Sequence, residues 1–152
     1  MKLISIILLS VIVLELSAQN TNITSLYEGP FEDVVKESKK SKRLIFLDFT
    51  SKSCKSCLKM EQEAFANKAI AEKLNDDYIV YKVNIEDLEG RKLIHKYEIR
   101  EFPAYIILDS ETKIKGKILG FYQAHQFLKE INRLAIDTSQ IKPIKRKRKL
   151  FG

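Results

Sequence analysis

The sequence predicts an α/β fold in which a mixed four-stranded sheet lies between helices that cover both of its faces. Segments with helical spacing alternate with segments of strand character along most of the chain. Helical segments separate the first two strands, and such a crossover makes two strands of one sheet parallel. Only a short turn separates the last two strands, which makes them antiparallel. The length of 152 residues and the apolar content of 45% suit one domain with a real core.

The first 18 residues have the layout of a secretory signal peptide. A basic start at Lys2 precedes an apolar run over residues 3–14, and Ala18 offers a small residue at the cleavage position. The run is shorter than the roughly 20 apolar residues that a spanning helix needs, although an uncleaved membrane anchor is the alternative. We therefore expect a mature chain that begins near Gln19 and is periplasmic or secreted.

The predicted domain covers residues 30–138 and follows a polar lead-in segment over residues 19–29. A helix is expected over residues 30–40, because Pro30 suits a first helical turn and an apolar stripe follows it. That stripe consists of Phe31, Val34 and Val35. The continuous apolar run over residues 44–49 then predicts a strand that is buried on both faces, as in a parallel sheet.

Helical spacing returns over residues 58–65 and 69–74, and an apolar run predicts a second strand over residues 78–83. A further helix is expected over residues 88–97. Residues 104–108 read as a third strand.

A turn over residues 109–112 leads into residues 113–119, where apolar positions and lysines alternate with period two. Outward-facing lysines are typical of an exposed edge strand, because they oppose pairing with other chains. The apolar stripe of a final amphipathic helix consists of Phe127, Leu128, Ile131, Leu134 and Ala135.

The net charge of +7 is concentrated in a C-terminal tail, residues 139–152. Six of the basic residues lie there: Lys142, Lys145, Arg146, Lys147, Arg148 and Lys149. The domain itself is nearly neutral, so we expect no nucleic-acid partner for an exported protein. The tail is expected to be disordered and solvated, and contact with anionic lipid headgroups is the alternative.

Chemistry is expected at Cys54 and Cys57, the only two cysteines of the chain. Cys54 follows a buried strand at the start of a helix, where free N–H groups stabilise a thiolate, and Lys52 and Lys55 add positive charge beside it. We therefore expect a depressed pKa and the role of nucleophile for Cys54. Cys57 lies one helical turn further on and would resolve the mixed disulfide.

Two alternatives to this redox role are that the cysteine pair forms a structural disulfide or that it supplies half of the ligands of a metal site. A zinc site needs about four ligands, whereas His95 and His125 are the only histidines and stand far apart in the sequence. We therefore expect no metal and no cofactor.

Three features together resemble the thioredoxin superfamily: the run Phe46-Leu47-Asp48-Phe49-Thr50, the CxxC motif after it, and Phe102-Pro103 before the third strand. Gly120, before the last helix, also resembles the family pattern. The resemblance covers about residues 30–136 and is greatest to envelope thioredoxin-like domains, such as the C-terminal domain of the transmembrane disulfide-reducing transporter. It implies a thioredoxin-like sandwich.

The resemblance implies roles for three further residues. Asp48 matches the family's buried acid, whose pKa an apolar strand would raise, and it would accept the proton of Cys57. Pro103 matches the family's cis-proline. The backbone of Phe102 would pair with the substrate chain like an added strand.

The sequence also departs from thioredoxins. Ser53 stands where they usually have Trp, Lys55-Ser56 replaces their Gly-Pro pair, and Leu58 replaces a common Lys. Inner residues shift the redox potential, so the sequence leaves the preferred direction open. Reduction is the better hypothesis, because the nearest resemblance is to reducing envelope domains.

The predicted function is therefore a thiol–disulfide oxidoreductase in the cell envelope. It would reduce client protein disulfides as a monomer and receive electrons from an envelope thiol donor. The alternative is a redox-inactive binding module on a thioredoxin fold, against which the presence of both cysteines and Asp48 argues.

Overall fold

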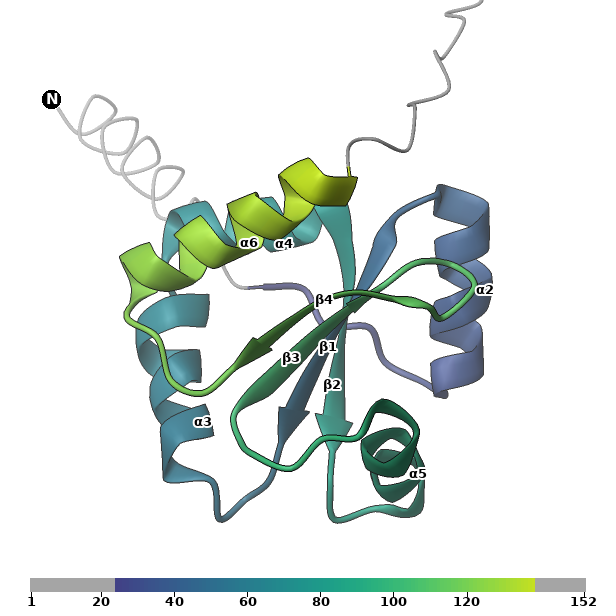
Figure 1. Cartoon of the computed structure of the whole chain (residues 1–152), viewed down its shortest axis with the longest axis horizontal. Helices are drawn as coiled ribbons and strands as arrows, with labels where there is room; N and C mark the ends of the chain where they lie inside the picture. Colours follow the sequence, from purple (N-terminus) through teal and green to yellow (C-terminus); the bar gives the residue numbers. More distant parts are fainter. Residues whose placement is uncertain (1–23, 139–152) are drawn as a thin grey trace, which may run out of the picture.

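A twisted four-stranded sheet runs through the middle of the computed structural model, which describes residues 24–138 (Figure 1). The strands are β1 (Leu44–Thr50), β2 (Tyr78–Asn84), β3 (Ala104–Leu108) and β4 (Ile114–Leu119). Their order across the sheet is β2-β1-β3-β4. β1 pairs in parallel with β2 and antiparallel with β3, and β3 pairs antiparallel with β4. The mixed sheet predicted from the sequence is confirmed.

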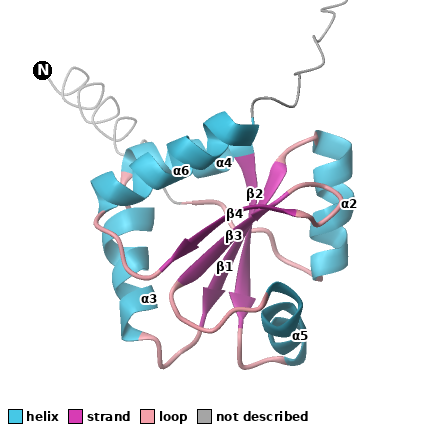
Figure 2. Ribbon diagram, in the orientation of Figure 1, coloured by secondary structure: helices cyan, strands magenta, loops and turns pink. Residues whose placement is uncertain are grey.

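Helices cover both faces of this sheet (Figure 2). They are α2 (Phe31–Ser41), α3 (Lys55–Met60), the π-helical turn η2 (Glu61–Phe65), α4 (Lys68–Asp77), α5 (Leu88–Tyr97) and α6 (Ala124–Thr138). α2 and α5 lie on one face, and α3, α4 and α6 lie on the other. The predicted α/β sandwich with helices on both faces is therefore correct.

Each face of the sheet has its own hydrophobic core, because successive side chains of a strand point to opposite faces. In β1, Ile45, Leu47 and Phe49 pack toward α2 and α5. Phe46 packs toward the other helices, where it meets Tyr105 and Phe127. The burial of β1 on both faces agrees with its continuous apolar sequence.

Polar caps begin two of the helices close to where the sequence pattern predicts them. Asp87 accepts a hydrogen bond from the Gly90 backbone N–H at the start of α5, and Asn67 caps α4 in the same way. Pro30 is the N-cap of α2, one position outside the first turn that the sequence predicts. The predicted helix over residues 58–65 instead begins at Lys55 and changes to π-helical hydrogen bonding at Glu61.

The lead-in segment contributes to the sheet at its β2 edge. Leu26 forms a parallel bridge with Val80, and the Tyr27 backbone N–H donates to the Val80 carbonyl oxygen at 2.8 Å. The predicted signal peptide (residues 1–18), the first residues of the lead-in and the basic tail (residues 139–152) lie outside the described residues. Within residues 24–138, no helix is both long enough and apolar enough to cross a membrane.

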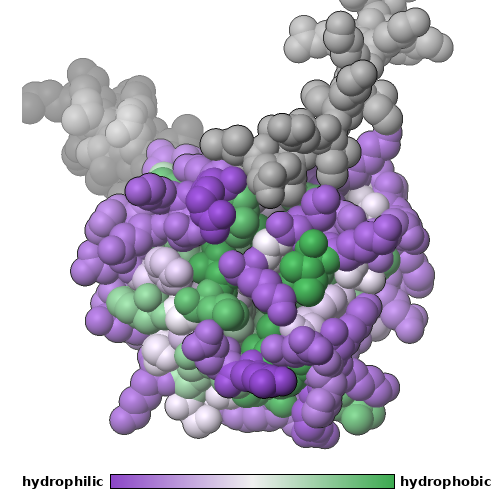
Figure 3. Space-filling view, in the orientation of Figure 1, coloured by the Kyte–Doolittle hydropathy of each residue, from purple (hydrophilic) through white to green (hydrophobic). Residues whose placement is uncertain are grey.

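β4 forms the other edge of the sheet, as its alternating lysines predict. Figure 3 shows the surface of the molecule in the orientation of Figure 1. Hydrophilic side chains cover much of this surface, and hydrophobic ones gather toward its middle. The large apolar side chains exposed along β4 and the loop after it are Ile114, Leu119 and Phe121. The Lys59 ammonium group lies 4.7 Å from the centre of the Phe121 ring, which ties this loop to α3.

Candidate active site

Cys54 and Cys57 form a disulfide at the junction of β1 and α3. The S–S distance is 2.03 Å and the two Cα atoms are 5.3 Å apart. Cys54 is the N-cap residue of α3, and its sulfur accepts a hydrogen bond from the Cys57 backbone N–H at 3.2 Å. The expected position of Cys54 at a helix start is therefore present, and the N–H group is in place to stabilise a thiolate after reduction.

The two sulfurs differ in their access to solvent. Cys57 is 3% exposed, and its sulfur lies 3.9 Å from the carbonyl oxygen of Phe49. Cys54 is partly exposed and lines an open groove with a volume of about 460 Å³. An incoming sulfur atom therefore has a path to Cys54 that it does not have to Cys57.

Asp48 lies in the middle of β1, with its side chain on the same face of the sheet as Phe46 and Tyr105. Burial raises the pKa of Asp48 to about 7, the positive charge of Lys82 lowers this pKa, and the negative charge of Glu61 raises it. The expected upward shift of this pKa is therefore present. A carboxyl group with a pKa near 7 can both accept and release a proton at neutral pH.

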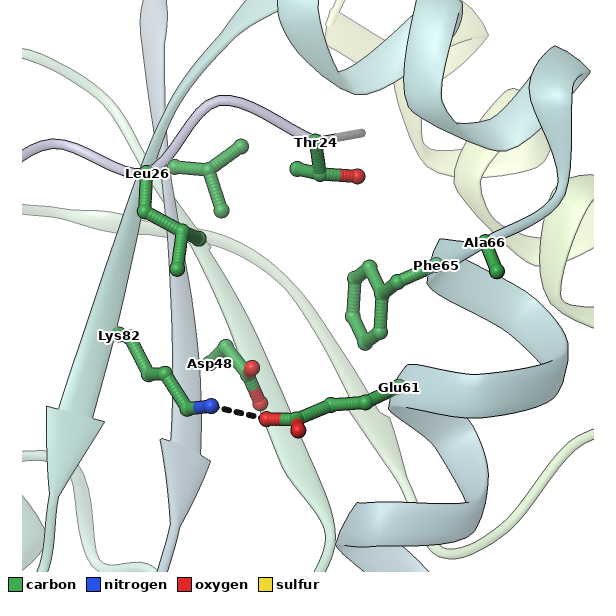
Figure 4. A pocket seen from close by; sticks show the side chains of 8 residues that line it. Thr24, Leu26, Asp48, Glu61, Phe65, Ala66 and Lys82 are labelled. Carbon is green, nitrogen blue, oxygen red and sulfur yellow. Dashed lines mark hydrogen bonds and ion pairs between the residues drawn. The ribbon is translucent and has the colours of Figure 1, made fainter. Parts of the chain in front are cut away.

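The Asp48 carboxyl group faces an ion pair between Glu61 and Lys82 (Figure 4). Lys82 lies directly opposite Asp48 in the pairing of β1 with β2, and Glu61 begins the π-helical turn. The three side chains line one cavity of about 280 Å³, whose apolar wall includes Leu26 and Phe65. Burial and the nearby Asp48 charge also raise the pKa of Tyr105 above its ordinary value.

Sequence reasoning missed Glu61 and Lys82. One signal for Lys82 is that it is the only charged residue in the apolar run of β2. For Glu61, the signal is its place two helical turns beyond Cys54 on the same side of the helix. Neither signal identifies the partner, because the contact depends on the strand register.

Phe102 and Pro103 lie at the same end of the sheet as Cys54. Ala104, the next residue, pairs with Phe49 near the end of β1 that leads to Cys54. The Phe102–Pro103 peptide bond is cis, and the Pro103 carbonyl oxygen accepts a hydrogen bond from the Gly120 backbone N–H at 2.8 Å. The structure thus brings Cys54, Cys57 and Pro103 to one end of the sheet, with Asp48 buried beneath them.

The two histidines lie apart, exposed on α5 and α6. Within the described part of the chain, no group of three or more His, Cys, Asp or Glu side chains is arranged to hold a metal ion.

Comparisons with known proteins agree with this geometry. The model of the thioredoxin-like domain family matches residues 31–135. Over 117 residues the chain is 28% identical to the thiol:disulfide interchange protein DsbD of Campylobacter jejuni, an alignment that covers 76% of this chain and 20% of that protein. The chain thus spans about a fifth of the length of the curated relatives it matches.

Two solved structures have the same fold. A thioredoxin from Thermus thermophilus superposes with a TM-score of 0.68 at 20% identity, covering 76% of this chain and 91% of that one. The oxidised C-terminal domain of DsbD from Neisseria meningitidis superposes with a TM-score of 0.59 at 17% identity, covering 72% of this chain and 98% of that domain. The resemblance read from the sequence is confirmed, and the chain belongs to the thioredoxin-like domain family.

Proposed function

We propose that this protein is a thiol–disulfide oxidoreductase that reduces the disulfides of client proteins through Cys54 and Cys57. The observation that carries the proposal is the unequal access to the two sulfurs of one CxxC disulfide. Cys54 opens onto a groove, whereas Cys57 is 3% exposed. A disulfide that served only to hold the fold together would gain nothing from one accessible sulfur.

The reaction begins with both cysteines reduced. The Cys54 thiolate attacks one sulfur of the client disulfide, whose S–S bond breaks as the Cys54–client bond forms. The Cys57 thiolate then attacks the Cys54 sulfur and releases the second client thiolate. Two electrons have passed to the client, and the Cys54–Cys57 disulfide is the oxidised product.

Asp48 has the role of proton acceptor in the second step. Cys57 must lose its proton before it can attack, and burial opposes a free thiolate. The buried carboxyl group of Asp48 has a pKa of about 7, which suits proton uptake at neutral pH.

Phe102 and Pro103 have the role of holding the client chain. They precede β3 at the end of the sheet that carries Cys54. The backbone of Phe102 would pair with an extended client segment as an added strand, which would bring the client disulfide over Cys54.

The proposed place of action is the cell envelope, either periplasmic or secreted. The signal-peptide pattern of residues 1–18 supports export, and the matched relatives include thiol:disulfide interchange proteins by name. We further propose a monomer that is re-reduced by an envelope thiol donor and needs no cofactor, with membrane contact through its basic tail as a secondary feature. N-terminal sequencing of the exported form tests the cleavage near Gln19.

An insulin-reduction assay with dithiothreitol as donor tests the proposed activity. The wild-type protein should speed precipitation of the insulin B chain, and Cys54→Ser should abolish this effect. Ser53→Ala is a matched control, because it changes a neighbouring side chain without removing a sulfur. A wild-type protein no faster than Cys54→Ser would instead favour the redox-inactive binding module.

A further inference from the structure

A groove beside Cys54 lies on the side of the active site away from Phe102 and Pro103. Its walls come from the loop after β1, from α3 and from β2, and they include Lys52, Leu58 and Asn84. β2 and β3 flank β1 on opposite sides. A client chain that pairs with Phe102 on the β3 side therefore leaves this groove free.

The groove is lined by more positive than negative charge. Lys52, Lys55 and Lys82 line it, and Glu61 is the only acidic residue that does so within the described part of the chain. Glu61 forms its ion pair with Lys82 within this lining. A second acid, Glu86, stands outside the lining and accepts a hydrogen bond from the Lys52 backbone N–H at 3.3 Å. The Lys52 and Lys55 side chains are exposed at the rim and supply the excess positive charge.

The size of the groove suits a small molecule. Its volume of about 460 Å³ lies within the range of roughly 300–1,000 Å³ that is typical of small-ligand sites. The side chains of Thr50 and Ser51, which line the groove together with Cys54, are small. Leu58 is 54% exposed and gives the groove one apolar wall against which a peptide stem can pack.

We propose that this groove binds small acidic disulfides and thiols, namely peptides of two or three residues that carry carboxylates near their sulfur. Lys52 and Lys55 attract the carboxylates while the sulfur lies against Cys54. The proposal rests on the proposed function of Cys54 and adds a substrate class to it.

The exchange balances without a further reactant. The Cys54 thiolate attacks one sulfur of the bound disulfide, the S–S bond breaks, and the leaving thiolate takes a proton from water. Cys57 then attacks the Cys54 sulfur, gives its own proton to Asp48, and releases the second small thiolate. Two electrons pass from the protein dithiol to the small disulfide. In reverse, two small thiols reduce the Cys54–Cys57 disulfide.

The test compares three probes that differ in charge. The reduced full-length protein is oxidised by glutathione disulfide, which is anionic, by cystamine, which is cationic, and by hydroxyethyl disulfide, which is neutral. Rates follow from acid quenching and separation of the reduced and oxidised protein. The ratio of the glutathione disulfide rate to the cystamine rate should fall about three- to tenfold in Lys52→Glu, as expected for reversing one exposed charge.

Lys113→Glu is the matched control, because it makes the same change of charge at the far end of the sheet. Lys113 precedes Ile114, which pairs with Leu108, and Leu108 pairs with Ile45 near the end of β1 remote from Cys54. The rate ratio should stay within twofold of wild type in this control. The neutral probe measures the change in Cys54 reactivity itself, because Lys52 also adds positive charge beside Cys54, and the ratio of the two charged-probe rates cancels this change.

Three results would overturn the proposal while leaving the oxidoreductase function standing. One is a rate ratio that is unchanged in Lys52→Glu, and another is an equal fall in Lys113→Glu. The third is a loss in Lys52→Glu that is confined to a disulfide-bonded acidic protein, because the groove would then serve client proteins. Failure of the neutral probe to oxidise the wild-type dithiol would contradict the proposed function itself.

Discussion

Asp48 lies directly opposite Lys82 in the parallel pairing of β1 with β2, and the Lys82 ammonium group forms its ion pair with Glu61. The positive charge of Lys82 lowers the pKa of Asp48, but burial outweighs it and raises the pKa to about 7. At neutral pH the folded protein therefore holds this carboxyl group close to the midpoint of its titration.

The first prediction concerns stability and pH. The Asp48 carboxyl group titrates near 3.8 without burial and near 7 in the folded protein. Above pH 4 the unfolded state therefore releases this proton first, so Asp48 costs stability as the pH rises from about 4 to about 7. Asp48→Asn should gain stability over wild type across this window, by up to about 4 kcal/mol at pH 8.

Urea unfolding of oxidised wild type and Asp48→Asn at pH 4 and pH 8 measures this difference. Glu63→Gln is a matched control, because Glu63 is an exposed carboxylate in the π-helical turn and its removal changes the charge by the same amount. A stability difference between wild type and Asp48→Asn that does not change with pH would mean that the pKa of Asp48 is the same in the folded and unfolded states.

The second prediction concerns the resolving step. Asp48→Asn should still form mixed disulfides with clients, because Cys54 is unchanged, but it should release the reduced client more slowly. The slowing should be greatest just above pH 7, where Asp48 is largely ionised and can accept a proton, and it should shrink below pH 7, where Asp48 is itself protonated. Single-turnover reduction of a disulfide-bonded peptide between pH 6 and pH 9 separates the two steps. Equal release rates at every pH would reject a proton-transfer role.

The third prediction assigns the attacking thiol. In the reduced protein near neutral pH, iodoacetamide should label Cys54 faster than Cys57, because Cys54 lines the groove and Cys57 is 3% exposed. Cys57→Ser should accumulate mixed disulfides with clients, and Cys54→Ser should accumulate few or none. Faster labelling of Cys57 would reverse the assignment.

The fourth prediction concerns the packing of α5 against the end of β2. A Cβ atom added at Gly90 would lie 1.8 Å from the Asn84 carbonyl oxygen, a backbone atom that cannot turn away. Gly90→Ala should therefore lower the free energy of unfolding by about 1–3 kcal/mol. Lys92→Ala, on the exposed side of the same helix, should change it by no more than about 0.5 kcal/mol. The midpoints of urea unfolding measure both effects. Equal midpoints for wild type and Gly90→Ala would contradict the predicted clash.

Much of the fold could be predicted from local patterns. The bounds of β3 and α5 match the predicted ones, because Pro103 and the Asp87 cap mark sharp starts that coincide with the apolar spacing. The π-helical turn could not be predicted, because buried Met60 and Ala64 are four residues apart and suit a continuous α-helix equally well. The central place of β1 between β2 and β3 also depends on tertiary packing that no local pattern encodes.

Some residues of the candidate site could likewise be identified from the sequence, and others could not. Cys54, Cys57 and Asp48 could be found from the sequence because each is an unusual residue in its segment. Glu61 resembles an ordinary surface charge, and Lys82, although it is the only charge in the β2 run, has no identifiable partner until the register of β1 with β2 brings it opposite Asp48. The groove next to Cys54 likewise appears only once the loop after β1 and the end of β2 lie together.

The reduction potential of the Cys54–Cys57 pair, measured by equilibration with glutathione buffers, tests the central claim most directly. A dithiol that reduces client disulfides should have a potential of about −200 to −270 mV, the range of glutaredoxins and thioredoxin. A value below about −300 mV would mark a structural disulfide, and a value near about −120 mV would mark an oxidant. Either of these results would contradict the assignment of this protein as a reductant of client disulfides.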